Sequence, residues 1–356
     1  MGKRPFYDGT KLLSMKDKNG HKPEIYMCVG NRTAGKSYFF KRLMLRRYVK
    51  NKEKFCILVR FAYELDGVAD NFFKDLEQID FKGHELVGKP FGKDLFVELF
   101  FDGKHCGYAV ALNTADTIKK YSARFVDVNN IFFDEFQSET GKYCPDELTK
   151  FQSMHVSIAR GGGKHVRYVP VYMCSNTVTV LNPYFAQFDV TKRLQKDTKF
   201  LKGDGWVLEN CYVDSAAEAL KQSGFARAFA NSDYMAFATT NDYLLDNEHF
   251  IEKVKGEGRL LITIVDGSTR VGLWEYQEAG LFYVAHKFDP RHPHNIALYT
   301  DDHNVNTMMI KLWSKYAQIM RMAFEAGAMR FEDQTCKNIA LDFLRYSTIE
   351  RTKKKS

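Results

Sequence analysis

The chain has 356 residues and a formal net charge of +8, with 45% apolar and 27% charged residues. This length exceeds what one hydrophobic core usually holds, so one large domain or two are expected, and the composition excludes an intrinsically disordered chain. No apolar stretch approaches the roughly 18 residues of a membrane span, and no apolar segment follows the basic N-terminus, so neither a membrane protein nor a secreted protein is expected. The seven cysteines are scattered without a CxxC pair, which favours a reduced cytosolic protein.

The positive charge is concentrated at the N-terminal end. Residues 1–60 carry 16 Lys and Arg against 4 Asp and Glu, whereas residues 61–246 carry 20 against 26. A basic end of this kind indicates a polyanionic partner, either nucleic acid or nucleotide phosphate. A lysine-rich helix face that serves solubility is the alternative.

Short apolar runs alternate with helical patterns over residues 1–202. Strands are expected at residues 25–29, 55–59, 95–101, 107–112, 131–133 and 168–174. Asp102-Gly103 separates the third and fourth runs and predicts a hairpin turn. Residues 37–50 place apolar side chains on one side and predict an amphipathic helix. The alternation predicts an α/β domain with a parallel sheet and helices on both faces.

The pattern changes after residue 202. An Ala-rich stretch from Asp214 to Phe229 predicts a small helical linker over residues 203–246. A second alternating pattern then predicts a separate α+β domain over residues 247–350, followed by a basic tail at 351–356. In that domain the expected strands lie at 259–265, 271–274 and 281–285, and the expected helices at 308–326 and 338–345.

The strongest motif matches the phosphate-binding pattern G-x-x-x-x-G-K-[ST]. It consists of Gly30, Asn31, Arg32, Thr33, Ala34, Gly35, Lys36 and Ser37. Glycines let successive backbone N–H groups face a phosphate, and the following helix adds its positive N-terminus. Lys36 can reach the β- and γ-phosphates and Ser37 can ligate Mg²⁺, so the motif predicts an ATP site.

The second motif, Ile131 to Phe136, is an apolar strand that ends in two acids. Asp134 is expected to hold Mg²⁺ opposite Ser37, and Glu135 is expected to polarise the attacking water. An Asp followed directly by Glu points to the ASCE type of P-loop NTPase, which has an added strand between the two motifs. The roughly 100-residue gap before Asp134 leaves room for that strand.

Two further segments supply candidates around the phosphates. Ser175 and Asn176 end an apolar strand, so either could sense the γ-phosphate or orient the water; a plain turn is the alternative. Arg160 precedes three glycines, and an arginine there suits stabilisation of a transferring phosphoryl group from a neighbouring subunit. A surface loop with an incidental arginine is the alternative.

Carboxylates of the C-terminal domain could be read as a two-metal nuclease site. They are Asp266, Asp289, Asp301 and Asp302. Because they lie mostly in turn-like contexts, ordinary turns are favoured over a metal site.

Taken in order, these motifs resemble the DNA-packaging ATPase of small podophages of the phi29-like group, whose motor carries a structural RNA and which is related to large terminases and the FtsK-HerA class. The resemblance covers nearly the whole chain. Beyond the ATPase motifs it is carried by Phe6-Tyr7, Lys11 to Ser14, His84 to Val87, Asp102 to Lys104, Asn182 to Phe185, Phe250 to Lys253, Val271 to Trp274, Thr300 to Asp302, Met329 to Gln334 and Asn338 to Ala340.

The resemblance implies a ring, usually of five subunits, at the portal vertex of a procapsid in the host cytoplasm, without a membrane. It implies ATP and Mg²⁺ as cofactors and double-stranded DNA and prohead RNA as partners. It also implies a C-terminal domain of ribonuclease-H-like shape that has lost its catalytic carboxylates and binds the RNA. The family's trans-acting arginine falls by position on Arg160. The family's loop is richer in arginine, which leaves Arg167 and Arg124 as rivals.

The sequence therefore predicts a motor that moves double-stranded DNA into a procapsid, with Glu135, Lys36 and Arg160 as catalytic residues. Three alternatives differ in class. The first is a conventional large terminase with an active C-terminal nuclease. The second is a nucleic-acid-binding scaffold switched by ATP, and the third is a monomeric P-loop kinase.

Overall fold

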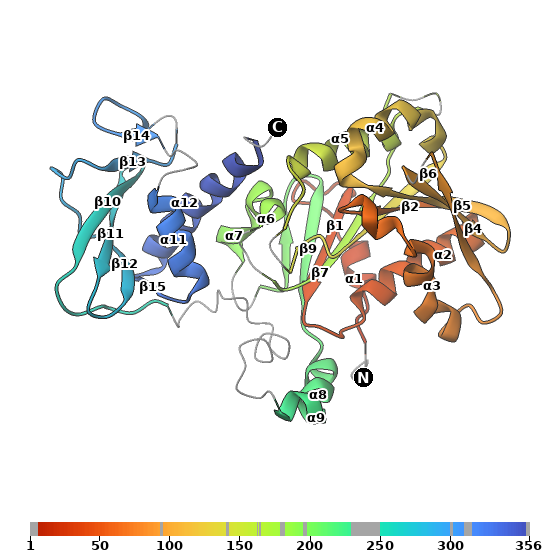
Figure 1. Ribbon diagram of the computed structural model, residues 1–356, viewed down its shortest axis with the longest axis horizontal. Coiled ribbons are helices and arrows are strands. Elements are labelled where there is room, and N and C mark those ends of the chain that lie inside the picture. Colours follow the sequence, from red (N-terminus) through yellow and green to blue (C-terminus); the bar gives the residue numbers. More distant parts are fainter. Residues whose placement is uncertain are drawn as a thin grey trace. The chain divides into compact units, whose positions relative to one another are not determined.

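The protein is described from a computed structural model. The described residues are 6–92, 95–139, 142–161, 163, 165–178, 182–194, 198–228, 250–299, 302–309 and 315–353. They form two compact units, coloured along the chain in Figure 1. The first unit contains residues 6–178 and 198–228, and the second contains residues 182–194 and 250–353.

The first unit is built on a nine-stranded sheet. Across the sheet its strands are β3 (Leu86–Phe91), β4 (Phe96–Phe101), β5 (Lys104–Ala111), β2 (Lys54–Val59), β6 (Val128–Asp134), β7 (Val171–Asn176), β1 (Ile25–Gly30), β9 (Trp206–Cys211) and β8 (Phe200–Lys202). The six central strands, which lie in the order β5, β2, β6, β7, β1 and β9, run parallel to one another. The outer strands β3, β4 and β8 pair antiparallel with their neighbours. The predicted parallel sheet is therefore confirmed for its centre, and the sheet as a whole is mixed.

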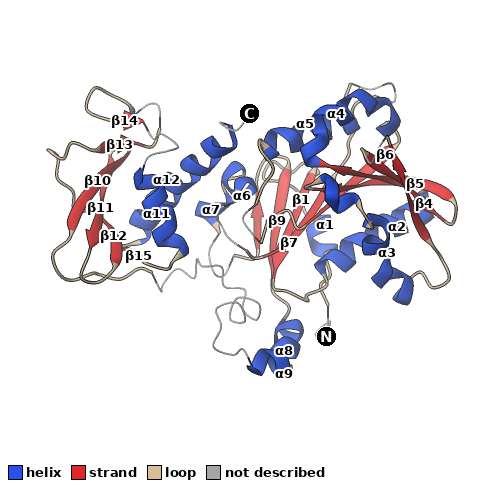
Figure 2. Ribbon diagram, viewed as in Figure 1, coloured by secondary structure: helices blue, strands red, loops and turns tan. Residues whose placement is uncertain are grey.

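Helices cover both faces of this sheet (Figure 2). Successive side chains of a strand point to opposite faces of the sheet, so the neighbours Phe132 and Phe133 of β6 face different helices. The Phe132 ring packs against Phe40 of α2, and the Phe133 ring packs against Phe151 of α5 on the opposite face. All four rings are buried. The helices of this unit are α1 (Thr10–Ser14), α2 (Lys36–Asn51), α3 (Val68–Ile79), α4 (Ala115–Ile118), α5 (Glu147–Ala159), α8 (Asp214–Gln222) and α9 (Gly224–Ala228), with 3₁₀ turns at Ala62–Leu65, Leu112–Thr114 and Lys119–Phe125.

The strand that separates the two nucleotide motifs comes from an unexpected part of the chain. The sequence left room for it before Asp134, but in the sheet β7 lies between β1 and β6, and β7 follows both motifs in the chain. The earlier segment instead supplies β2 and the antiparallel strands β3 to β5. The register pairs Asp134 with Cys174 and Gly30 with Asn176, so the tips of β6, β7 and β1 meet at one edge.

The end of the sheet differs from the expected domain boundary at residue 202. That boundary falls between β8 and β9, which pair with each other, and β9 also pairs with β1. The Ala-rich helices α8 and α9 follow and confirm the helical pattern from Asp214. Phe229 and the rest of the expected linker, to residue 246, lie outside the described residues.

The second unit is a six-stranded sheet with helices. Its strands across the sheet are β14 (Met308–Met309), β13 (Asn295–Ala297), β10 (Arg259–Asp266), β11 (Thr269–Tyr276), β12 (Leu281–Ala285) and β15 (Met329–Phe331). Its helices are α6 (Pro183–Gln187), α7 (Val190–Arg193), α11 (Lys315–Glu325) and α12 (Gln334–Lys353). The helix expected over residues 308–326 is wrong at its start, because Met308 and Met309 pair with β13 as a strand.

The C-terminal end and the membrane expectation can also be compared with the fold. Residues 351–353 of the expected basic tail form the last turn of α12 rather than a separate tail. Within the described ranges, no helix is both long enough and apolar enough to span a lipid bilayer.

Candidate functional site: a nucleotide site at the tips of three parallel strands

The predicted phosphate-binding loop links the end of β1 to the start of α2. A side chain at Gly30 is excluded, because a Cβ there would lie 2.2 Å from the Cys211 carbonyl oxygen on β9. Gly35 has φ +90° and Thr33 has φ 58°, so the loop turns through left-handed conformations before the helix begins at Lys36. The loop therefore has the tight backbone curl that anion binding at a helix N-terminus requires.

Lys36 holds the loop and the neighbouring strand tip together. Its buried ammonium donates to the carbonyl oxygens of Gly30 (3.1 Å) and Asn31 (2.7 Å) and lies 3.3 Å from Asn176 Oδ1. A lysine at this position is a compact cation at the mouth of the loop. It is therefore placed where phosphate oxygens would compete for its N–H groups.

Two segments distant in the chain fix the loop from outside. The Asn31 side chain exchanges hydrogen bonds with the backbone of Val213, at 3.1 and 3.0 Å. The backbone N–H of Tyr7 donates to Ala34 (2.8 Å), and the Tyr7 hydroxyl donates to Glu209 Oε2 at 2.7 Å. These contacts hold the loop in place, and Tyr7 belongs to the Phe6-Tyr7 pair through which the N-terminus resembles the phi29-like family.

Ser37 and Asp134 meet as the sequence predicts. Ser37 Oγ donates to Asp134 Oδ1 at 2.9 Å, and the buried Cys174 thiol donates to the same oxygen at 3.1 Å. A hydroxyl beside a carboxylate, at the end of a phosphate-binding loop, is the donor set that P-loop proteins use for Mg²⁺. The residues present therefore fit this metal ion.

Glu135 follows Asp134 in a left-handed backbone conformation, with φ 50°. The pKa of its carboxyl group is raised, chiefly by burial and then by the charges of Asp134 and Glu139, while Arg32 and Arg60 oppose this shift. A carboxylate with a raised pKa is a better proton acceptor near neutral pH than an ordinary one. A raised pKa is one property expected of the general base that the sequence predicts at Glu135.

We expect the acid limb of kcat/KM for ATP hydrolysis to have its midpoint above pH 4.5, the ordinary value for a glutamate. The base works only when deprotonated, so activity is lost as the pH falls through the raised pKa. Glu139→Gln should move this midpoint to lower pH, because it removes a repelling charge and releases Arg32. A pH–rate series on both proteins tests this, and an unmoved midpoint would contradict the assignment.

Arg60, at the end of β2, is a site residue that the sequence analysis did not identify. Its buried guanidinium donates to both carboxylate oxygens of the buried Glu147, at 3.1 and 2.9 Å. It also donates to the carbonyl oxygens of Phe136 (2.8 Å) and Glu135 (3.3 Å). Arg60 thus supports the backbone turn that presents Glu135. A charged residue directly after a buried strand was the available signal.

Glu147→Gln is expected to lower the free energy of unfolding of the first unit by about 3–5 kcal/mol, because it leaves the buried Arg60 without its anionic partner. Glu139→Gln is the matched control, since the Arg32–Glu139 pair is partly exposed and its loss should cost at most about 1 kcal/mol. Calorimetric melting of both variants measures the difference. Equal stability of the two variants would contradict a stabilising role of the buried Arg60–Glu147 pair.

The tip of β7 carries the predicted sensing pair. Ser175 is buried, and its Oγ has no hydrogen-bond partner among the described residues. Asn176 donates from Nδ2 to Glu139 Oε1 at 2.9 Å, and Arg32 of the loop pairs with the other oxygen of Glu139. Glu139, which the sequence analysis did not identify, thus bridges the loop and the strand tip. Its position four residues after Glu135 was the only signal.

The three candidate arginines lie at the opposite, amino end of β6. Arg160 contacts Ser122 Oγ and the carbonyl of Lys119, and its side chain is exposed. Arg124 pairs with Glu98 at 2.8 Å. Arg167 donates to backbone carbonyls, including that of Val128 at 2.8 Å. The fold therefore does not bring any of them to the nucleotide site of its own chain.

Two of the four C-terminal carboxylates, Asp289 and Asp302, stabilise turns. Asp302 accepts a hydrogen bond from Gly267 N, and Asp289 accepts one from Arg291 N, both at 2.9 Å. Asp266 ends β10, and Asp301 lies outside the described residues. Among the described residues the metal-ligating side chains that converge in threes are His286, Asp333 and Cys336, where Asp333 already accepts the Cys336 backbone N–H.

Comparisons with known proteins give matches along almost the whole chain. The model of the podovirus DNA encapsidation protein (Gp16) family matches residues 1–349. The chain is 29% identical to the DNA packaging protein of Bacillus phage phi29 over 354 residues, which cover 98% of this chain and 100% of the relative. It is 25% identical to the DNA packaging protein of Bacillus phage B103 over 328 residues, which cover 90% of this chain and 97% of that relative.

A solved structure agrees as well. A chain of the bacteriophage phi29 viral genome packaging motor assembly superposes with a TM-score of 0.55 and 26% identity, covering 98% of this chain and 100% of its own length. The family match extends over almost the whole chain, and it includes every residue of the nucleotide site. The chain therefore belongs to the podovirus DNA encapsidation protein (Gp16) family and is a DNA packaging motor ATPase of the phi29-like phages.

Proposed function

We propose that this motor ATPase moves double-stranded DNA into a procapsid as a ring, with each ATP hydrolysed between two subunits. The observation that carries the proposal is the convergence of Ser37, Asp134 and Lys36 at the tips of adjacent parallel strands, with Glu135 directly following. This set binds and hydrolyses a nucleoside triphosphate in P-loop proteins. Because the chain belongs to a family of DNA packaging proteins, we propose that the free energy of ATP hydrolysis drives DNA packaging.

Ser37 and Asp134 are the residues that would hold Mg²⁺, and backbone N–H groups of residues 31–36 would face the phosphates. Bound Mg²⁺ neutralises charge on the β- and γ-phosphate oxygens. Lys36 would exchange its contacts with loop carbonyls for phosphate oxygens. The buried Ser175 hydroxyl and the Asn176 amide, at the tip of the strand between the two motifs, would orient the water or sense the γ-phosphate.

Glu135 would accept the proton from the attacking water. The αL backbone turn at Glu135, supported by Arg60, directs the chain away from the strand direction immediately after Asp134. The two acids would therefore have different roles: Asp134, beside Ser37, would hold Mg²⁺, and Glu135 would face the attacking water.

Arg160 would complete the site of the neighbouring subunit. β6 has seven residues, and at about 3.3 Å per residue its ends are roughly 20 Å apart. Arg160 lies by the amino end of this strand, whereas its own Asp134 lies at the carboxyl end. An arginine so placed reaches a phosphoryl group only in another copy of the chain, which makes hydrolysis depend on ring contacts.

We also propose the finer domain assignments. The order β6–β7–β1 supports an ASCE-type ATPase domain, which we extend to residue 211 because β9 is part of its sheet. The helices α8 and α9 support a linker from residue 212 to about 246. The antiparallel β10–β11–β12 meander, with β13 parallel beside β10, supports a ribonuclease-H-like domain. We assign prohead RNA and the portal as partners of the assembled ring.

A packaging reaction tests the proposal. Full-length protein, procapsids bearing portal and prohead RNA, linear duplex DNA and ATP should yield DNA protected from nuclease, and protection should fall with salt because phosphate contacts dominate DNA binding. Multiple-turnover hydrolysis without any protected DNA would support the kinase or scaffold alternatives instead. Cleavage of duplex DNA by the full chain with Mg²⁺ or Mn²⁺ would support the terminase alternative.

A further inference from the structure

The loop that carries Arg160 is anchored by a second arginine. α5 ends at Ala159, and the chain then passes through Arg160 and returns toward β7. The Arg167 guanidinium donates to three backbone carbonyls: Val128 (2.8 Å), Phe125 (3.3 Å) and Ile158 (2.7 Å). The Arg167 backbone N–H donates to Ala159 at 2.8 Å. One side chain therefore ties the end of α5 to the turn before β6.

We infer that Arg167 is a positioning residue that holds Arg160 in the orientation needed at the neighbouring subunit's nucleotide. This inference rests on the proposed role of Arg160 in trans. It removes Arg167 from the list of candidate fingers and gives it a different task. A planar guanidinium with N–H groups on two sides suits this task, because it can join carbonyls that face it from different segments.

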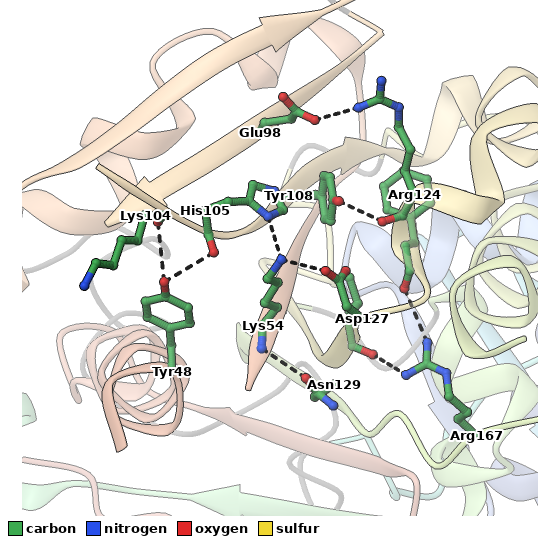
Figure 3. A network of polar contacts seen from close by, with 12 residues as sticks. Tyr48, Lys54, Glu98, Lys104, His105, Tyr108, Arg124, Asp127, Asn129 and Arg167 are labelled. Atoms are coloured by element: carbon green, nitrogen blue, oxygen red, sulfur yellow. Dashed lines mark hydrogen bonds and ion pairs between the residues drawn. The ribbon is translucent and has the colours of Figure 1, made fainter. Parts of the chain in front are cut away.

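The turn to which Arg167 is tied is itself rigidly mounted. Lys54, at the start of β2, pairs with Asp127 at 2.6 Å and contacts His105 Nδ1 at 2.9 Å. The Lys54 backbone N–H donates to Asn129 Oδ1 at 3.1 Å. Figure 3 shows Lys54 between His105 and Asp127, and Arg167 extended toward the same turn from the other side. The turn is thus held from both sides, and it provides a fixed base for Arg167.

The loop itself needs an anchor of this kind. Gly161 has φ +99°, and a Cβ there would lie 2.9 Å from the Val126 side chain, so the chain passes close over the turn with a glycine conformation. Gly163 also has a positive φ, of 76°. Glycines leave the backbone many alternative conformations. The contacts of Arg167 on both ends of the segment limit those alternatives.

The contacts of the two arginines also differ, and they make Arg160 the better candidate to reach a phosphate of a neighbouring subunit. To reach a neighbouring subunit, Arg167 would have to give up hydrogen bonds to three carbonyls from a half-buried position. Arg160 is exposed, and the hydrogen bonds of its guanidinium to other described residues go to Ser122 Oγ and the Lys119 carbonyl. Arg160 can therefore swing outward at much lower cost.

A double-mutant cycle on ATPase activity of the assembled, DNA-stimulated motor tests the inference. Arg160→Ala should lower kcat by about 10³-fold. Arg167→Gln should lower it by about 10²-fold, the effect of a misplaced catalytic group, and Arg167→Lys should retain part of the activity because it keeps the charge without the planar fork. The double variant Arg160→Ala/Arg167→Gln should be no worse than Arg160→Ala alone, since Arg167 acts through Arg160.

The readouts separate a positioning role from a merely structural one. Nucleotide affinity of the same subunit, measured by titration with a fluorescent ATP analogue, should be unchanged in Arg167→Gln, so the loss appears in kcat and not in binding. Arg46→Gln is a matched control: Arg46 of α2 has an exposed side chain that pairs with Asp80 at the C-terminal end of α3 (3.0 Å), not with this loop. This variant should keep normal activity. If Arg167→Gln does not fold, Arg167→Lys takes its place in the cycle.

Each outcome decides one of the two proposals. Additive losses in the double variant would mean that Arg167 acts independently of Arg160, and would overturn the inference. Full activity of Arg167→Gln beside an inactive Arg160→Ala would also overturn it while leaving the role of Arg160 intact. Full activity of Arg160→Ala would instead overturn the proposed trans site on which the inference rests.

Discussion

Glu135→Gln is expected to lower kcat for ATP hydrolysis by about 10³-fold while ATP still binds. The amide keeps the shape of the side chain but accepts no proton from water. The groups proposed to bind nucleotide are untouched, because the contacts of Lys36 and of Ser37 with Asp134 do not involve the Glu135 side chain. Removing one of three neighbouring carboxylates also lowers repulsion toward phosphates, so affinity should be equal or tighter. Phosphate release and nucleotide titration measure the two quantities.

The matched control for this experiment is Glu139→Gln, which changes a carboxylate in the same cluster without changing the residue next to Asp134. It should cost less activity than Glu135→Gln, because Glu139 bridges Arg32 and Asn176 and has no proposed role in proton transfer. Normal turnover in Glu135→Gln would remove this residue from the mechanism. An equal loss in both variants would place the base elsewhere in the cluster.

The centre of the fold follows from local patterns. Each of the six strands expected in the first domain is present, because buried parallel strands appear as short continuous apolar runs and their ends are marked by turn residues. The hairpin at Asp102-Gly103 is also confirmed, with positive φ at both residues, as a tight two-residue turn requires. These features depend on neighbouring residues alone.

The peripheral strands were not predicted, for reasons visible in their sequences. β3 contains Gly88 and Pro90, which normally weigh against a strand but are tolerated at a sheet edge. β9 carries Glu209 and Asn210 near its end, so it does not read as a buried run. Met308-Met309 continues an apolar pattern toward α11, and periodicity alone does not separate a short strand from the first turn of a helix.

The nucleotide site shows the same division. The residues of the contiguous motifs, Gly30 to Ser37 and Asp134-Glu135, could be predicted because spacing along the chain fixes their chemistry. Arg60 and Glu139 could not, because their roles depend on strand order and on contacts between segments distant in sequence. The placement of Arg160 at the far end of β6 likewise follows only from the fold.

Arg160→Ala is expected to lower ATP hydrolysis by the assembled motor by about 10³-fold, the usual contribution of an arginine that contacts a transferring phosphoryl group. Nucleotide binding should survive, since Arg160 lies at the opposite end of its own sheet from Asp134. The measurement is steady-state hydrolysis on procapsids with DNA, beside nucleotide titration of the free subunit. Loss of binding together with turnover would indicate an unfolding defect.

Mixing two inactive variants tests whether Arg160 acts on the nucleotide of a neighbouring subunit. A ring interface that joins the nucleotide site of an Arg160→Ala subunit to the Arg160 of a Glu135→Gln subunit contains every required group, although neither variant is active alone. In a one-to-one mixture about a quarter of the interfaces of a head-to-tail ring are complete in this way. Hydrolysis should therefore return in the mixture, and its dependence on the mixing ratio should pass through a maximum. If Arg160 acted within its own chain, no interface would be complete and no ratio would restore activity.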